Sequence, residues 1–224
     1  MNTPFRTSFR KILPPLALLF LFLSACDEAT APTENARIEV RLTDAPSDML
    51  AFAEVTISAV YLQGGPGDDD SAGTDESDDE DGSSGRTYLF QASEGEEPFT
   101  VDLLELQNGV SVALAEAEVE PGDYGQLRFV VDGSLVGLLD GYTFQDGSTE
   151  REIRIPSGST SGIKVILTNE IEAQSGETFE ILVDFDVDEA FRFPGMTSDT
   201  IVREVRFSPV LRELSRSTEA GTDG

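Results

Sequence analysis

The sequence predicts an all-β protein with little helix, built as a two-sheet antiparallel β-sandwich. Apolar and polar residues alternate with a period of two in many short runs, and turn dipeptides separate these runs every 8 to 15 residues. Stretches with the 3.6-residue period of a helix are scarce. This pattern is typical of a sandwich because each strand buries one face against a second sheet.

Each alternating run is expected to form one strand, with its apolar row on one side of the pleat. In the first run, apolar residues at 38, 40 and 42 alternate with charged residues at 37, 39 and 41. The expected strands lie within residues 37–42, 55–57, 127–131, 152–155, 163–168, 179–188 and 205–207. Short strands of this kind favour an Ig-like or transthyretin-like Greek-key order.

The breaks between runs carry turn chemistry, since their glycines can adopt positive φ angles. Residues 142–145 and 149–155 flank Asp146-Gly147 and form the clearest expected hairpin. Residues 101–106 and 47–53 are expected to form single helical turns. The remaining predicted turns are at Asn108-Gly109, Pro121-Gly122-Asp123, Asp132-Gly133, Asp140-Gly141 and Ser175-Gly176.

The start of the chain resembles the leader of a bacterial lipoprotein. Three basic residues precede an apolar stretch of about 12 residues, which is the length of a signal-peptide core and too short for a membrane-spanning helix. Leu23-Ser24-Ala25-Cys26 follows and contains the only cysteine. In lipoproteins this lipobox implies cleavage before the cysteine and attachment of diacylglycerol to its thiol, so Cys26 is the predicted lipidation site. The alternative is an ordinary secretory leader with an incidental cysteine.

These features divide the chain into segments. Residues 1–25 are the expected signal peptide, 26–36 a lipidated tether, 37–214 the folded sandwich domain, and 215–224 a disordered tail. Within the domain, residues 64–85 contain Gly, Ser and nine carboxylates between Asp68 and Asp81. Such a segment cannot bury enough apolar area to offset its ordering entropy, so it is expected to be a disordered acidic insertion.

The chain is strongly acidic, with a formal net charge of −28 over 224 residues. Without the leader, 12 basic residues stand against 43 acidic ones, a charge of −31. Phosphates would be repelled, which argues against nucleic acid as a partner. Membrane attachment is therefore expected through the N-terminal lipid rather than through a basic patch.

Five sets of residues together resemble the domain-of-unknown-function 4382 family of secreted and lipid-anchored prokaryotic proteins. The resemblance covers roughly residues 36–212 and implies a β-rich extracytoplasmic domain, with no activity to transfer. The residues are LTDAP at 42–46, VDLL at 101–104 with QNG at 107–109, PGDYGQLR at 121–128, PSG at 156–158 with SGIK at 161–164, and DFD at 184–186.

Asp184, Asp186 and Asp188 are the best candidates for a metal site. Spaced by two, they would line one face of a strand with neighbours about 6.6 Å apart. Carboxylate oxygens suit calcium, and Asp44 or Asp132 could complete the set. The other interpretation is a solvated acidic strand face with no ligand. The sequence thus predicts no cofactor, with calcium as the one candidate.

The remaining candidates are weaker. The sequence contains no histidine, which excludes Ser-His-Asp catalysis and His-ligated zinc or haem. An enzyme could still use two carboxylates, but acidic residues are so abundant that no pair stands out. A carboxylate-based hydrolase is therefore the least favoured hypothesis, and the protein is not expected to be an enzyme. The hydroxyl-rich stretch 156–162 is either an inter-strand loop or an anion or sugar site. Without tryptophan, sugar stacking would have to use Tyr61, Tyr88, Tyr124 or Tyr142.

The sequence therefore predicts a lipid-anchored extracytoplasmic protein of the cell envelope that acts as a binding or structural module. Its partners would be the membrane, through the lipid, and an envelope protein or glycan. A carbohydrate- or protein-binding accessory domain and a calcium-dependent module are the alternatives. The ligand-binding residues are not identified at this stage.

Overall fold

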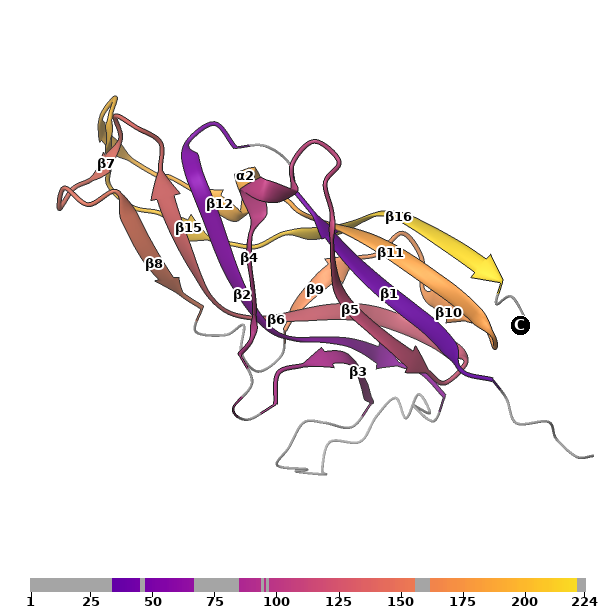
Figure 1. Cartoon of the computed structure of the whole chain (residues 1–224). Coiled ribbons are helices and arrows are strands. Elements are labelled where there is room, and N and C mark those ends of the chain that lie inside the picture. The colour runs from indigo at the N-terminus through magenta and orange to yellow at the C-terminus, as the bar shows by residue number, and fades with distance from the viewer. Residues whose placement is uncertain are drawn as a thin grey trace, which may run out of the picture. The chain divides into compact units, whose positions relative to one another are not determined.

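The computed structural model describes residues 34–44, 47–66, 85–93, 95, 97–155 and 162–220, without the side chain of Arg154, and strands dominate them (Figure 1). The prediction of a β-rich chain with little helix is confirmed. The helices in this part of the chain are the 3₁₀ turn η1 (Leu103–Leu106) and α2 (Val187–Ala190), and neither is long and apolar enough to cross a membrane. The strands are β1 (Ala36–Thr43), β2 (Leu50–Gly64), β3 (Arg86–Gln91), β4 (Phe99–Asp102), β5 (Val112–Val119), β6 (Gly122–Leu138), β7 (Thr143–Phe144), β8 (Glu150–Arg154), β9 (Ile163–Ile166), β10 (Ile171–Ala173), β11 (Glu177–Phe185), β12 (Phe191–Arg192), β13 (Met196–Ser198), β14 (Ile201–Val202), β15 (Arg206–Phe207) and β16 (Leu211–Ala220).

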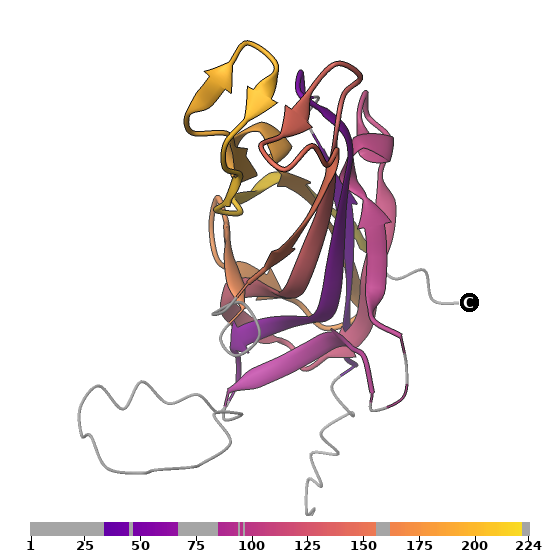
Figure 2. The ribbon, with the colours of Figure 1, turned by 90° about the vertical axis from the view of Figure 1, so that its left-hand side faces the viewer.

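Eleven strands form one continuous sheet with the order β3-β2-β6-β9-β16-β11-β1-β5, to which β4, β8 and β10 attach at the sides. The short strand β9 pairs with β6 on one side and with β16 on the other. Because of this bridge, the predicted pair of separate sheets is not confirmed. The sheet curves until its end strands β3 and β5 lie close together without pairing, so that it is nearly closed (Figure 2).

The prediction of a purely antiparallel arrangement is wrong, because three pairs of strands are parallel. These pairs are β1–β11, β16–β9 and β14–β7. In the first pair, Ile38 lies opposite Phe179, which is distant in the sequence. Side chains alternate with the same period in parallel and antiparallel strands, so the sequence pattern could not distinguish the two.

The strands β2 and β6 form the longest pair in the sheet and run from one end of the domain to the other. Gly64 pairs with Tyr124 at one end, and Leu50 pairs with Leu138 at the other. At about 3.3 Å per residue, the 15 residues of β2 span about 45 Å. We call the end at Gly64 the seam end, because β3 and β5 meet there, and the end at Leu50 the far end.

The core lies inside the curved sheet and follows the alternation that the sequence predicts. Ile38, Val40 and Leu42 of β1 are fully buried, and the apolar residues of β11 continue the same layer. Burying each aliphatic or aromatic side chain contributes roughly 1.5–3 kcal/mol, so this layer is the main source of stability. Tyr61 belongs instead to a small cluster on the other face of the sheet with Ala59, Val130 and Tyr88.

Short strands cover the far end. β12 pairs with β15, while β13, β14 and β7 form a separate three-stranded sheet. Aromatic packing holds the first pair, since the ring centroid of Phe207 lies 4.8 Å from that of Phe191 and 6.3 Å from that of Phe185. Both short sheets depend on side-chain packing because two or three residues provide few ladder hydrogen bonds.

The structure corrects three predicted boundaries. Ala36, placed in the tether, begins β1 and is fully buried. The predicted disordered tail is wrong as far as Ala220, because β16 pairs with β11 up to that residue. The acidic insertion cannot begin at Gly64, which is the last residue of β2. Residues 1–33, 67–84 and 221–224 lie outside the described part, so the signal peptide, most of the tether and the insertion stay predictions.

Several predicted turns are confirmed, one is misplaced, and the predicted hairpin does not form. Asn108, Gly109, Gly141, Gly147 and Gly176 all have positive φ angles. Asp132-Gly133, however, lies within β6, where the register shifts by one residue and makes Asp132 the extra residue of a β-bulge. At Asp146-Gly147 the tight turn is present, but its flanking strands pair elsewhere, β7 with β14 and β8 with β6.

Of the two predicted helical turns, the one at 101–106 is partly confirmed. Residues 103–106 form η1, and Asp102 caps it by accepting a hydrogen bond from the Leu104 amide at 3.1 Å. The turn predicted at 47–53 is wrong, since β2 already begins at Leu50. The apolar and polar residues that follow Leu50 alternate as in a strand, and β6 is the strand with which they pair.

Candidate functional site

The predicted metal ligands do not share one strand face, because β11 ends before the second of them. Asp184 lies in β11, whereas Asp186 caps the short helix α2 and Asp188 lies in its first turn. The Asp186 Oδ1 accepts a hydrogen bond from the Glu189 amide at 2.9 Å. The signal in the sequence was the Asp-x-x-Glu spacing of a helix N-terminus, which competes with a strand at this position.

Arg212 of β16 supplies a positive charge to this cluster. Its Nη1 donates to Asp186 Oδ2 at 2.9 Å, and its Nη2 donates to Glu189 Oε2 at 2.7 Å. Within the described residues, no group of three or more carboxylates is placed to hold a metal ion. A calcium ion at Asp186 would have to compete with the guanidinium, and calcium binding stays a prediction.

Burial raises the pKa of the Asp184 carboxyl above its usual value. The nearby charge of Asp186 adds to this effect, and Arg212 opposes it. Taking a carboxylate out of water and placing it beside a like charge both disfavour the ionised form. Asp184 therefore costs the fold some stability at neutral pH.

The two further candidate ligands have structural roles. Asp44 is buried, and its Oδ1 accepts a hydrogen bond from the Val187 amide at 3.1 Å, which ties β1 to the start of α2. Asp132 lies in the bulge of β6 and accepts a hydrogen bond from Ser58 Oγ at 2.9 Å. The structure therefore does not bring Asp132 together with Asp184 and Asp186. Ala45 and Pro46 lie outside the described residues.

The tyrosines differ in exposure. Tyr61 and Tyr124 each expose only 1% of their surface, so neither offers a free ring face for sugar stacking. The guanidinium of Arg86 covers Tyr61, with 4.9 Å between its central carbon and the ring centroid. Tyr88 and Tyr142 are half-buried. Cys26 and residues 156–161 of the hydroxyl-rich loop lie outside the described part.

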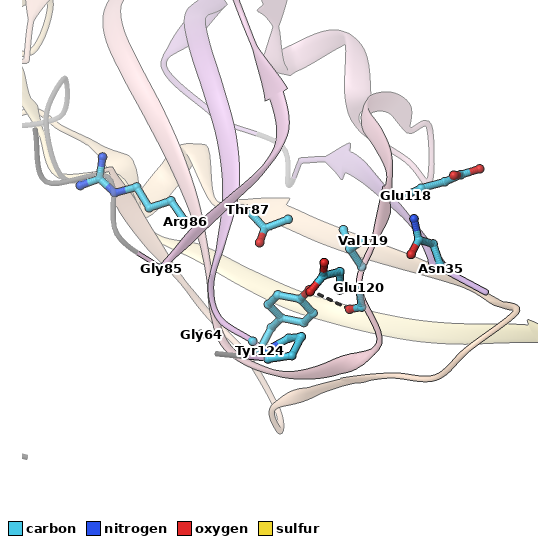
Figure 3. Close-up of a pocket in the computed structure, with 11 residues that line it drawn as sticks. Asn35, Gly64, Gly85, Arg86, Thr87, Glu118, Val119, Glu120 and Tyr124 are labelled. Carbon is cyan, nitrogen blue, oxygen red and sulfur yellow. Dashed lines mark hydrogen bonds between the residues drawn. The ribbon is translucent and has the colours of Figure 1, made fainter. Parts of the chain in front are cut away.

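A cavity of about 380 Å³ lies at the seam end, where the sheet does not close (Figure 3). Thr87 of β3 and Val119 of β5 line its two sides, so the end strands of the sheet form its walls. Tyr124 lies beneath them, and its hydroxyl donates to the Glu120 carbonyl at 2.8 Å. We call this cavity the seam hollow.

Glycines allow the chain to pack closely around this tyrosine. A Cβ on Gly65, which has φ +124°, would lie 2.6 Å from the Tyr124 ring, and a Cβ on Gly122 would lie 2.6 Å from Pro66. Both distances are far below a normal carbon contact. The corner formed by residues 64–66 and 120–125 is therefore tightly packed, and it contains Pro121-Gly122-Asp123, where the sequence predicts a turn.

Burial raises the pKa of the Tyr124 phenol; the neighbouring Thr87 hydroxyl lowers it, and the charge of Glu120 raises it further. The phenol therefore stays protonated at neutral pH and acts as a hydrogen-bond donor. This favours a structural role for Tyr124, because a general base or nucleophile would need the opposite shift.

A second, larger hollow of about 690 Å³ shares the lining residues 64–66 with the seam hollow. Its polar lining comes from the amides of Gln63 and Gln126 and the carboxylates of Asp123 and Glu170, together with several glycines. Amide and carboxylate groups can hydrogen-bond hydroxyl groups, and glycines let a ligand approach the backbone. We call it the polar hollow. Sequence reasoning missed it because its residues come from three separate segments.

Comparison with known proteins gives one finding. The model of the family described as Domain of unknown function (DUF4382) matches residues 35–201. Searches of curated proteins and of solved structures gave no significant match.

Proposed function

The chain belongs to the DUF4382 family, and we propose that it acts as a lipid-anchored, extracytoplasmic module of the cell envelope with a binding or structural role rather than an enzymatic one. The observation that carries this proposal is the leader that ends at Leu23-Ser24-Ala25-Cys26 and contains the only cysteine. The first buried residue of the domain, Ala36, follows only ten positions later. Such a short connection would keep the domain within about 33 Å of its lipid.

The experiment is to express the full chain and its Cys26→Ser variant and to fractionate the cells. We expect the unchanged protein in the membrane fraction and the variant outside it, because a lipid contributes about 0.8 kcal/mol per buried CH₂ and the acidic surface contributes no attraction to anionic lipid. Mass spectrometry of the mature N-terminus provides the second measurement. An intact leader, or a processed N-terminus without acyl chains, would contradict the proposal.

The polar hollow supports a more specific candidate, the binding of a glycan or another polyhydroxylated ligand. Its two amides and two carboxylates surround a glycine-lined surface on a rigid corner. Ligand sites commonly combine a preformed concavity with a few convergent polar groups. A glycan array probed at moderate salt with the Cys26→Ser form tests this candidate, with Gln63→Ala as the variant expected to lose signal. A silent array would favour a protein partner or a purely structural role.

A further inference from the structure

The far end of the domain contains a pocket of a different character. It has a volume of about 300 Å³, at the lower limit of known ligand sites. Its walls come from β7, from β8 and from the link between β14 and β15. The strands β7, β8 and β15 are on the left-hand side of Figure 1. We call it the arginine pocket. It is lined by Phe144, Arg151, Glu152, Ile153, Arg203, Glu204 and Val205.

One arginine of this pocket is held in a fixed position. Arg151 stacks on Phe144 with 4.4 Å between its central carbon and the ring centroid, and its Nη2 donates to Asp146 Oδ2 at 3.0 Å. Phe144 itself is 2% exposed and forms part of the core. The Nε and Nη1 of Arg151 make no hydrogen bond with the residues that the structure describes. A guanidinium whose position is already fixed loses little conformational entropy when it binds a ligand.

The second arginine of the pocket is Arg203. Arg203 is exposed and forms no hydrogen bond or ion pair with any described residue. The neighbouring Glu204 makes its ion pair with Arg206, whose Nε lies 3.0 Å from Glu204 Oε1. The hydrogen bond and the charge of Arg206, and the charge of Arg203, lower the pKa of the Glu204 carboxyl. The pocket thus combines one fixed guanidinium, and one without a direct ion-pair partner among the described residues, with the apolar side chains of Ile153 and Val205. The carboxylates of Glu152 and Glu204 also line it.

The arginine pocket belongs to a strongly acidic protein. Its lining holds two arginines and two glutamates, while the chain beyond the leader has a net charge of −31. The overall field repels anions, and salt screens it beyond about 8 Å. Only short-range contacts could therefore hold an anion, and a monoanion would suffer less repulsion than a dianion.

We propose that the arginine pocket binds the carboxylate of an apolar acid, with the carboxylate on Arg151 and Arg203 and the apolar body against Ile153 and Val205. Guanidinium groups match carboxylates in geometry and charge. The acid can come from a free organic acid or from the C-terminus of a peptide, since both present one carboxylate next to an apolar group. This inference is independent of the polar hollow.

The test titrates the Cys26→Ser form with benzoate and with N-acetyl-alanyl-phenylalanine, followed by amide NMR shifts. We expect dissociation constants in the millimolar range and shifts that centre on residues 144, 151–153 and 203–205. The neutral analogues, benzamide and the peptide amide, should bind at least about fivefold more weakly, as should inorganic phosphate. The stronger of the two acids identifies the source.

Arg203→Gln is the test variant and Arg192→Gln the matched control, because Arg192 is exposed at the same end but does not line the pocket. Arg203→Gln should weaken acid binding about fivefold, while Arg192→Gln should change it by less than about twofold. Thermal unfolding verifies that both variants fold. The proposal is overturned by absence of binding, by equal binding of acid and amide, by phosphate binding as tightly as benzoate, or by equal losses in the two variants.

Discussion

The seam end and the far end of the domain are built by different means. At the seam end, β2 ends and β6 begins in one corner, where glycines, a proline and a buried tyrosine pack within van der Waals distance. At the far end, strands of two or three residues from separate parts of the chain meet over a few aromatic side chains. Backbone geometry specifies the first region, whereas side-chain packing specifies the second.

Hydrogen exchange should reveal this difference most strongly. Amides of β13 and β14 should open locally and exchange quickly, because residues 196–201 are largely exposed and have short ladders. Amides in the centre of β2 should exchange only on global unfolding, which implies protection at least about 10⁴-fold greater. Similar protection in both regions, measured by NMR, would mean that the short strands are as strongly held as the long ribbon.

Glycine substitutions provide the next largest effect. Gly65→Ala should lower the free energy of unfolding by about 3 kcal/mol, because it combines a left-handed φ angle with a clash against Tyr124. Gly147→Ala at the far end is the matched control. It also has a positive φ, +82°, but nothing lies within 4 Å of the added methyl group, so it should cost only about 1 kcal/mol. Urea denaturation measures both, and equal losses would show that the corner at Tyr124 adapts.

The smallest expected effect concerns the acidic cluster around Asp184 and Asp186. Folding raises the pKa of Asp184, so the native state binds its proton more tightly and loses stability as pH rises from the unfolded value near 3.9 to the folded one. Asp184→Asn removes this cost. Since the group is partly exposed, the gain at neutral pH should be about 0.5 kcal/mol after allowance for solvent screening, and it should vanish below about pH 3.5.

Urea denaturation of Asp184→Asn at both pH values tests this prediction, with Asp188→Asn as the control. Asp188 is exposed in the first turn of α2 and should give no gain, since its charge favours the helix N-terminus. A gain of equal size for both variants would indicate a general effect of net charge instead of burial at Asp184.

Part of the candidate sites could be predicted from the sequence, and part could not. The turn predicted at Pro121-Gly122-Asp123 falls where β5 ends and β6 begins, at the seam end, because turn chemistry is local. The metal prediction at Asp186 and Asp188 rested on a strand that ends at Phe185, so its geometric premise was wrong. The arginine pocket could not be predicted from the sequence, since Arg203 joins Phe144 and Arg151 only through long-range packing.

The sequence by itself determined which residues face the core, where most turns form, and the membership of the family. These properties depend on period-two alternation and on single residues such as glycine, and both act over a few positions. Only the tertiary structure decided that β1 pairs in parallel with β11, that β9 joins the sheet into one, and which charges meet at either end. A strand has the same side-chain period beside any partner, so the choice among partners depends on how the whole core packs.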